Sequence, residues 1–248
     1  MPVRYVAVTK AEQSSPTSVV ISMDYLPIFL NIKGQPCLVV GGGAVAARKV
    51  RLLLQAGGSV SVVASALCPE LAALSAEKSI QHIERDFEAQ DLRKQVLVIA
   101  ATDELDINSR VSKLAKRQRI PVNVVDQPDL CSFITPSIID RSPVQVAIST
   151  GGASPVLARL LRTHLEPYIP SAYGRLASLV DEFRDQVKRQ FTNVTQRRYF
   201  WERVLQGSVA ELLFAGREDA ARKALEKAVN EADEIPEVAG EVYLVGAG

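Results

Sequence analysis

A glycine-rich turn between an apolar run and an amphipathic segment most constrains the fold of this chain. The run from Cys37 to Val40 indicates a buried strand, and residues 44–56 carry apolar side chains at helical spacing. Between them, residues 41–46 read GGGAVA and fit the pattern G-x-G-x-x-A. In a strand–turn–helix unit this pattern is typical of dinucleotide-binding domains, because a pyrophosphate can accept hydrogen bonds from the N–H groups that begin the helix.

Three positions of this turn have separate roles in that interpretation. Gly41 permits the tight turn, Gly43 lets the backbone approach the pyrophosphate, and Ala46 allows close packing of helix on strand. An acidic residue that binds the ribose is expected about 20 residues further on, but the sequence there is Val-Ala-Ser. Either a hydroxyl or backbone groups near Ser65 and Ala66 hold the ribose, or the affinity is modest. These residues do not decide between NAD and NADP.

Strands and helices alternate through the first part of the chain. Apolar, β-branched runs predict strands at 59–64, 95–102, 121–126 and 144–150, and helices are predicted at 68–78 and 106–118. This alternation predicts an α/β fold with a parallel sheet covered by helices on both faces. Beyond residue 150 the pattern becomes helical: Ser154 and Pro155 mark a helix start, and amphipathic helices are predicted over 171–206 and 208–230.

Composition excludes several functional classes. The net charge of +1 and the charged content of 23% give no general case for binding nucleic acid or a membrane surface. No apolar run approaches the roughly 18–20 residues of a membrane span, and residues 1–22 lack the features of a signal peptide. Cys37, Cys68 and Cys131 have no zinc or iron–sulfur spacing. They fit a reducing compartment, so we expect a cytoplasmic protein without a metal-binding cage.

Acidic residues follow two of the predicted strands, at the edge of the sheet where ligands gather. Asp126 ends the segment VNVVD, and a carboxylate there could take a proton while hydride leaves a substrate. The alternative, which the sequence alone favours, is an aspartate that caps the turn DQPD. Thr102 and Asp103 follow another strand and are expected to line the same cleft, although Asp103 or Asp106 could instead cap the next helix.

Two further features are consistent with an anionic ligand. Residues 148–155, ISTGGASP, place hydroxyls and two glycines before a capped helix, which suits an anion site and equally an ordinary loop. Residues 141–203 contain ten basic and five acidic side chains, a net charge of +5. Arginine suits a polycarboxylate through bidentate pairs, whereas a solvated helix face remains the default for most of these residues. Nucleic acid is disfavoured because aromatic interleaving is sparse and no reading motif occurs.

Several segments together resemble the N-terminal module of sirohaem synthase, the bifunctional precorrin-2 dehydrogenase and sirohydrochlorin ferrochelatase. They are MDYLPIFLNIKGQPCLVVGGGAVAARKVRLLLQAG, VIAATDELDIN, VNVVD with SFITPSIIDRSPVQVAISTGGASPVLARLLR, and RRYFWE. The resemblance runs from Met23 to about Arg203. PSIIDRSP and GGASPVLARLLR are far more specific than a glycine pattern.

The resemblance implies an activity and a site. Such modules oxidise precorrin-2 to sirohydrochlorin with NAD⁺ and then insert Fe²⁺, a substrate, to give sirohaem. The catalytic aspartate of the family, used in both steps, falls on Asp126, which reverses the preference for a capping role. The NAD contacts of the family fall on Ala44, Val45, Ser65 and Ala66, in keeping with the missing ribose-binding acid.

The resemblance also implies a tetrapyrrole substrate and a homodimer. The carboxylate-rich substrate would give arginines such as Arg141 a role, together with the loop of Ser149, Thr150 and Gly151. In the homodimer, segments after the nucleotide domain are exchanged between subunits. The regulatory phosphoserine of the family falls on Thr150, which keeps a hydroxyl. No His or Cys cage for iron is present, and a metal inserted into a macrocycle does not require one.

These observations give a domain plan and an expectation for the end of the chain. We expect a disordered leader at 1–22 and a NAD-binding Rossmann-type domain at 23–135. A dimerisation segment at 136–170 and a small helical domain at 171–230 should follow, and then a linker with a truncated strand at 231–248. The ending EVYLVGAG resembles the first strand of the uroporphyrinogen-III methyltransferase domain in fused family members. We therefore expect poor packing of those residues and no methyltransferase activity from this chain.

Two other functions are consistent with the residues. The first is an NAD-responsive regulatory or binding module without tetrapyrrole chemistry, in which Asp126 would be dispensable. The second is an NAD-dependent oxidoreductase acting on a small acid, which would need a catalytic His or Lys in the cleft. His82 and His164 do not lie at a predicted strand end.

Overall fold

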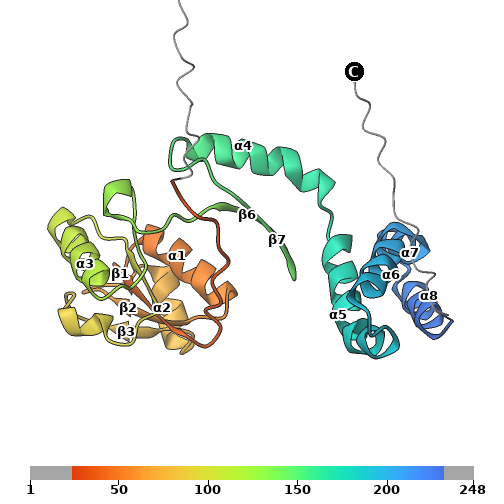
Figure 1. Cartoon of the computed structure of the whole chain (residues 1–248). Helices are drawn as coiled ribbons and strands as arrows, with labels where there is room; N and C mark the ends of the chain where they lie inside the picture. Colours follow the sequence, from red (N-terminus) through yellow and green to blue (C-terminus); the bar gives the residue numbers. More distant parts are fainter. Residues whose placement is uncertain (1–23, 232–248) are drawn as a thin grey trace, which may run out of the picture. The chain divides into compact units, whose positions relative to one another are not determined.

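The computed structural model of the chain describes residues 24 to 231 (Figure 1). The chain divides into two compact units between Val122 and Asn123. The predicted leader, and the linker and strand from residue 232 onward, lie outside the described residues.

The first unit is built on a parallel sheet of five strands in the order β3-β2-β1-β4-β5. The strands are β1 (Pro36–Val40), β2 (Ser59–Val63), β3 (Gln81–Ile83), β4 (Leu97–Ala100) and β5 (Val122–Val124), the last of which begins at the boundary between the units. Val40, at the end of β1, lies opposite Val63 of β2 and Ala100 of β4. The carboxyl ends of these three strands therefore come level, and the loops that follow them start side by side. The predicted Rossmann-type α/β class is confirmed.

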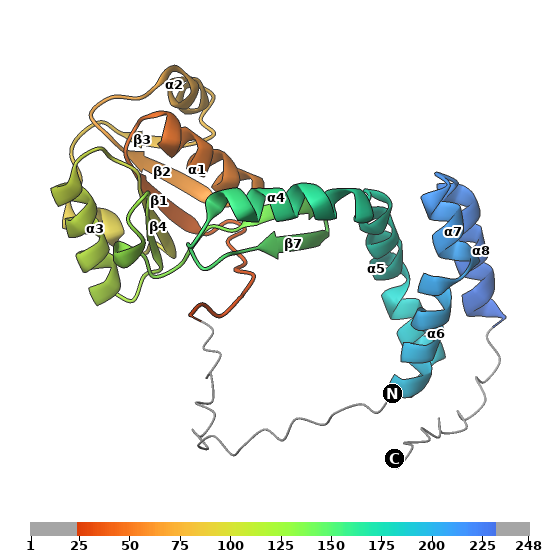
Figure 2. The same cartoon turned by 90° about the horizontal axis from the view of Figure 1, so that it is seen from above.

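Helices cover both faces of this sheet. They are α1 (Ala44–Gln55), α2 (Pro69–Ala76) and α3 (Leu105–Arg117), with a 3₁₀ turn at η1 (Ala89–Leu92). A second such turn, η2 (Pro128–Leu130), belongs to the second unit. In Figure 2, α3 lies on the opposite side of the strands from α1. The helix α1 buries Ala46, Ala47, Val50 and Leu53, the stripe that helical spacing predicts. Burial raises the pKa of the Cys37 thiol in β1 to about 11, so that thiol is a neutral packing group.

After the end of β5 and η2, the second unit continues with a hairpin and a helix. Strands β6 (Ser137–Arg141) and β7 (Val144–Ile148) pair antiparallel in a sheet of their own, and α4 (Pro155–Leu165) and η3 (Glu166–Tyr168) follow. The expectation of a further parallel strand at 144–150 is therefore wrong. Burial alternates along β7, which is typical of a half-exposed antiparallel strand, whereas parallel strands are buried on both faces. The strand β6 was not predicted.

Four helices complete the second unit: α5 (Ala172–Gln190), α6 (Val194–Gln206), α7 (Ser208–Phe214) and α8 (Glu218–Asn230). The two long helices that the sequence predicted are thus each divided. Asn193 begins α6 by accepting a hydrogen bond from the N–H of Thr195 at 2.8 Å, and Gly216 turns the chain with a φ of +73°. Buried side chains from all four helices form one apolar cluster, in which Phe200 packs against Phe191 with ring centroids 5.2 Å apart.

We predict that Phe200→Ala lowers the free energy of unfolding by about 3–5 kcal/mol, because truncating a buried aromatic side chain leaves a cavity. Phe200 is 0% exposed in this cluster. Val194→Ala, in the same helix at a side chain 72% exposed, is the matched control, and we expect a change within about 0.5 kcal/mol. Denaturant titration of the two variants measures the difference. Equal losses would contradict the assignment of Phe200 to the core.

Candidate functional site

The glycine-rich turn after β1 folds tightly against two neighbouring loops. Gly41 has a φ of +120°, and its N–H donates to the carbonyl of Val63 at 2.9 Å. A Cβ atom at Gly41 would lie 2.4 Å from the carbonyl oxygen of Ala101. A Cβ at Gly42 would lie 1.9 Å from the carbonyl oxygen of Ala66. Neither position has room for a side chain, so these glycines bring the loops after β1, β2 and β4 together.

Gly43 differs from its two neighbours. It has an ordinary φ of −84°, and no atom lies within 4 Å of the place its Cβ would take. It is the N-cap of α1, which has no side-chain cap and no acidic residue in its first turn. The start of α1, with Ala44 exposed and Val45 half-buried, is thus open and can donate backbone hydrogen bonds to an anion.

The loops beside this turn carry the other predicted cofactor residues. Ser65 and Ala66 are exposed on the loop after β2, and Asp103 is exposed after β4. Thr102 is bonded to the helix α3 that follows its loop, because its hydroxyl donates to Asn108 Oδ1 at 2.9 Å and Asn108 Nδ2 donates to its carbonyl at 2.9 Å. The structure therefore brings the predicted residues of the first unit to one edge of the sheet.

Two residues that shape this edge were not singled out from the sequence. Gly42 occupies a variable position of the pattern, and three consecutive glycines, where the pattern needs two, were the available signal. Asn108 is 2% exposed within α3, and nothing local distinguishes it from a surface asparagine. The helix α3 is capped by Glu104, without a side-chain hydrogen bond, so neither Asp103 nor Asp106 is its N-cap.

Asp126 lies on an exposed turn two residues beyond the end of β5, an edge strand of the sheet. The N–H of Gln127 donates to the carbonyl of Val124 at 3.3 Å and closes the turn. Asp126 has a φ of +58°, in the left-handed region that favours glycine. The next element, η2, is capped by Gln127 and not by Asp126. The turn thus presents the carboxylate of Asp126 to solvent.

The loop after β7 is held by its own hydroxyl groups. Thr150 Oγ1 donates to the carbonyl of Ser154 at 3.0 Å and accepts from its N–H at 3.2 Å. Ser154 Oγ accepts from the N–H of Leu157 at 3.2 Å, which confirms the predicted N-cap of α4. Ser149 Oγ accepts from the N–H of Gly151 at 3.0 Å. The hydroxyl groups keep the loop ordered, and Ser149 and Gly151 are exposed.

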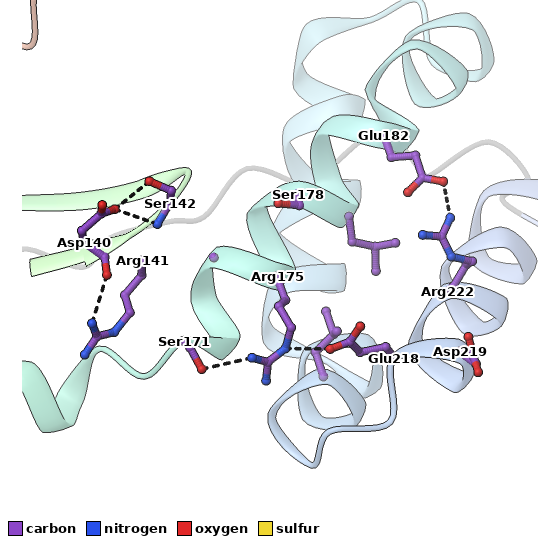
Figure 3. A pocket seen from close by; sticks show the side chains of 13 residues that line it. Asp140, Arg141, Ser142, Ser171, Arg175, Ser178, Glu182, Glu218, Asp219 and Arg222 are labelled. Atoms are coloured by element: carbon purple, nitrogen blue, oxygen red, sulfur yellow. Dashed lines mark hydrogen bonds and ion pairs between the residues drawn. The ribbon is translucent and has the colours of Figure 1, made fainter. Parts of the chain in front are cut away.

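Arg141 ends β6 and lines a pocket of about 720 Å³ between the hairpin and the helices of the second unit (Figure 3). Its Nε donates to the carbonyl of Ile169 at 2.9 Å, and a terminal nitrogen lies 3.2 Å from Glu166. Across the pocket, Arg175 pairs with Glu218 at 2.9 Å, and Arg222 pairs with Glu182 (Figure 3). Each arginine that lines the pocket is therefore already paired with a carboxylate.

The neighbour of Arg141 in the pocket is also engaged. The Ser142 hydroxyl donates to Asp140 at 2.6 Å, and the Ser142 N–H donates at 2.9 Å. These two hydrogen bonds, of which the one from the hydroxyl has the larger effect, hold the pKa of the Asp140 carboxyl below its usual range. Among residues 24–231, no three His, Cys, Asp or Glu side chains gather as metal ligands. No helix in that same range is both long and apolar enough to cross a membrane.

Three family profiles match successive parts of the chain. A profile described as NAD(P)-binding matches residues 28–137. One described as the central part of sirohaem biosynthesis proteins matches 141–167, and one described as the sirohaem synthase dimerisation region matches 172–229. The first profile covers β1 to β5, the second covers β7 and α4, and the third covers the four helices α5 to α8.

Relatives of known name agree with the profiles. A siroheme synthase of Thioalkalivibrio sulfidiphilus is 59% identical over 226 residues, and one of Nitrosospira multiformis is 57% identical over 230. Each alignment covers 91% of this chain but only 46% and 48% of the relative, so the chain spans about half their length.

A solved structure titled "SirC, precorrin-2 dehydrogenase" is similar in fold. It has a TM-score of 0.66 and 23% identity, with 82% of this chain and 100% of that chain covered. This chain therefore belongs to the sirohaem synthase family as its N-terminal part, with NAD(P)-binding, central and dimerisation regions in that order.

Proposed function

We propose that the chain is the precorrin-2 dehydrogenase and sirohydrochlorin ferrochelatase module of a sirohaem synthase, acting with NAD⁺ in the cytoplasm. The observation that carries this proposal is 59% identity to a siroheme synthase over a stretch that covers 91% of the chain. The three free thiols, Cys37, Cys68 and Cys131, are in keeping with a reducing compartment.

The turn of residues 41–43 and the start of α1 fit a dinucleotide. Gly41 and Gly42 hold the loops in place, while Gly43 leaves open space beside uncapped N–H groups of the helix. Ala44 and Val45 would contact the pyrophosphate through their backbone, and Ser65 and Ala66 would hold the ribose without a carboxylate. Thr102 and Asp103 would border the nicotinamide side. When bound, NAD⁺ supplies a hydride acceptor.

Asp126 acts as the general base in this proposal. Oxidation of precorrin-2 removes one hydride and one proton, and the proton passes to the carboxylate of Asp126. Insertion of Fe²⁺ into sirohydrochlorin releases two protons from pyrrole nitrogens, which the same carboxylate can accept and pass to solvent. The exposed position of Asp126, two residues beyond the end of β5 at the edge of the sheet where ligands of α/β folds bind, supports the assignment.

The substrate is a tetrapyrrole with carboxylate side chains, and the second unit supplies its proposed contacts. The N–H groups of Ser149 and Thr150 can donate to carboxylates, and no atom lies within 4 Å of the place that a Cβ of Gly151 would take. Arg141 would contribute charge if a substrate carboxylate replaced Glu166 as its partner. Thr150 is also the candidate for modification, which would break the hydrogen bonds of its hydroxyl to Ser154.

We predict that Gly42→Ala and Gly43→Ala separate folding from cofactor binding. Gly42→Ala should lower the thermal midpoint, because its methyl group would meet the carbonyl of Ala66. Gly43→Ala should leave the midpoint unchanged and weaken NAD⁺ binding at least about tenfold, since its methyl group would occupy the proposed pyrophosphate site. Thermal melts and calorimetric titration with NAD⁺ and NADP⁺ measure both effects. Unchanged NAD⁺ affinity in Gly43→Ala would contradict the proposed site.

We predict that Asp126→Asn reduces precorrin-2 oxidation by about 10²–10⁴-fold, the usual contribution of a general base. Asp129→Asn, three residues along the same loop, is the matched control and should keep wild-type turnover. The assay is anaerobic formation of sirohydrochlorin from precorrin-2 and NAD⁺, followed by absorbance.

In a second assay, Fe²⁺ or Co²⁺ is added to sirohydrochlorin, and the rate is compared with the spontaneous rate without protein. Full activity of Asp126→Asn in both assays would remove Asp126 from the mechanism. No turnover by the wild-type chain would favour the NAD-responsive regulatory module instead.

We further propose that the chain is a homodimer in which a second copy covers α4. The profile described as a dimerisation region supports a dimer. One face of α4 and the turn after it expose apolar side chains that are ordinarily buried. They are Val156, Leu157, Leu160, Leu161, Leu165 and Tyr168.

We predict that Leu157→Arg shifts the dimer toward monomer, because a charge would have to be buried in an apolar interface. Leu157 is 48% exposed in the single chain. Arg162→Glu, roughly 140° around the same helix and away from the apolar face, is the matched control and should leave the dimer intact. Analytical ultracentrifugation at several protein concentrations gives the dissociation constants. A monomeric wild-type chain, or equal dimerisation of both variants, would contradict this surface.

A further inference from the structure

The turn that carries Asp126 has few backbone hydrogen bonds of its own. The bond from Gln127 N–H to the Val124 carbonyl is long, at 3.3 Å, and Asp126 itself is in the left-handed region. Aspartate enters this region more readily than most residues, so a single long hydrogen bond leaves the conformation of the turn to be fixed by contacts with residues beyond it.

The side chain of Cys131 fills the inside of this loop. Its Sγ accepts from the N–H of Val124 at 3.2 Å and lies 3.3 Å from the Val124 carbonyl and 3.4 Å from the Gln127 carbonyl. The thiol hydrogen can bond to either carbonyl in turn. Both residues that flank the turn of Asp126 are thus tied to one sulfur atom.

The contact to Val124 has a second consequence. Because β5 is an edge strand, its outward N–H groups have no neighbouring strand to bond to. Cys131 supplies an acceptor for the N–H of Val124, where β5 ends and the turn begins. The sulfur thereby fixes the point at which the chain leaves the sheet.

Asn123 joins the same cluster from the strand. It is 7% exposed, and its Nδ2 donates to the Phe133 carbonyl at 3.0 Å and to Cys131 Sγ at 3.5 Å. The returning segment, residues 131–133, is therefore bonded to two successive residues of β5. These hydrogen bonds join the two ends of the loop that contains Asp126.

We propose that Cys131 is a positioning residue for Asp126: its thiol holds the turn in the conformation that presents the carboxylate to the substrate. This inference rests on the proposed function, in which Asp126 is the general base. Cys131 acts through hydrogen bonds to the backbone and takes no part in a covalent or redox step. Its role depends on a group that both donates and accepts, which a serine hydroxyl also does.

The test compares three substitutions in the full chain. Cys131→Ala removes the thiol, Cys131→Val also removes it but fills the space, and Cys131→Ser keeps a donor and an acceptor. We expect kcat for precorrin-2 oxidation to fall about 10- to 100-fold in the Ala and Val variants, the effect of misplacing a catalytic group by about 1 Å. The Ser variant should recover most of that loss, and KM for NAD⁺ should stay within about twofold throughout.

A double-mutant cycle tests whether Cys131 acts through Asp126. In an Asp126→Asn background, measured with enzyme in excess over precorrin-2, Cys131→Ala should cause no further loss. An independent further loss would overturn the inference, as would wild-type kcat in both apolar variants or an equal loss in Cys131→Ser. Those results leave the proposed function standing if wild-type protein turns over and Asp126→Asn does not. If the wild-type chain has no turnover, the proposed function fails and the inference fails with it.

Discussion

The close approach of the turn at Gly41 and Gly42 to the carbonyls of Ala101 and Ala66 determines the arrangement of the first unit. In a parallel sheet the loops that follow adjacent strands start about 4.8 Å apart, and side chains normally keep them separate. Here the absence of two Cβ atoms lets the loop after β1 pack directly on the backbone of the loops after β2 and β4. The edge of the sheet becomes a continuous backbone surface, and α1 begins from it with its N–H groups uncovered.

The loops of the second unit are held in a different way, by hydrogen bonds from side chains to backbone. Two of its loops are held by small polar side chains that bond to nearby backbone: Cys131 at the turn of Asp126 and Thr150 before α4. Hydroxyl and thiol groups suit this purpose because each can donate and accept in a small volume. The turn of Asp126 and the loop after β7, both proposed to meet substrate, are therefore held by hydrogen bonds, while Asp126, Ser149 and Gly151 remain exposed.

The sequence predicted correctly those elements whose signal lies within a few neighbouring residues. The buried run of β1, the glycine turn and the stripe of α1 are each visible within a few residues, and so is Ser154 as a helix cap. The strand β3 was missed because its sequence, QHI, contains one apolar residue and none that is buried, so no apolar run marks it, whereas the equally short β5 lies in the apolar run VNVV. The hairpin was misassigned because a short apolar run does not reveal the direction of its partner. Roles that depend on contacts formed by the folded loop, such as those of Asn108 and Cys131, have no local signal at all.

The turn at Asp126 shows why the role of that residue could not be settled from local chemistry. An aspartate in a segment such as DQPD, residues 126–129, ordinarily forms or caps a turn, and the sequence alone favoured that interpretation. In the structure Asp126 occupies the left-handed position of its turn, which aspartate tolerates better than most residues, and Lys78, Lys94 and Arg119 adopt the same region elsewhere in the chain. The backbone conformation of Asp126 is therefore compatible with a turn-forming role and with the proposed catalytic one. What distinguishes Asp126 is its place: it is exposed just beyond a strand of an α/β sheet, where ligands of such folds bind, and Cys131 helps to hold the turn itself.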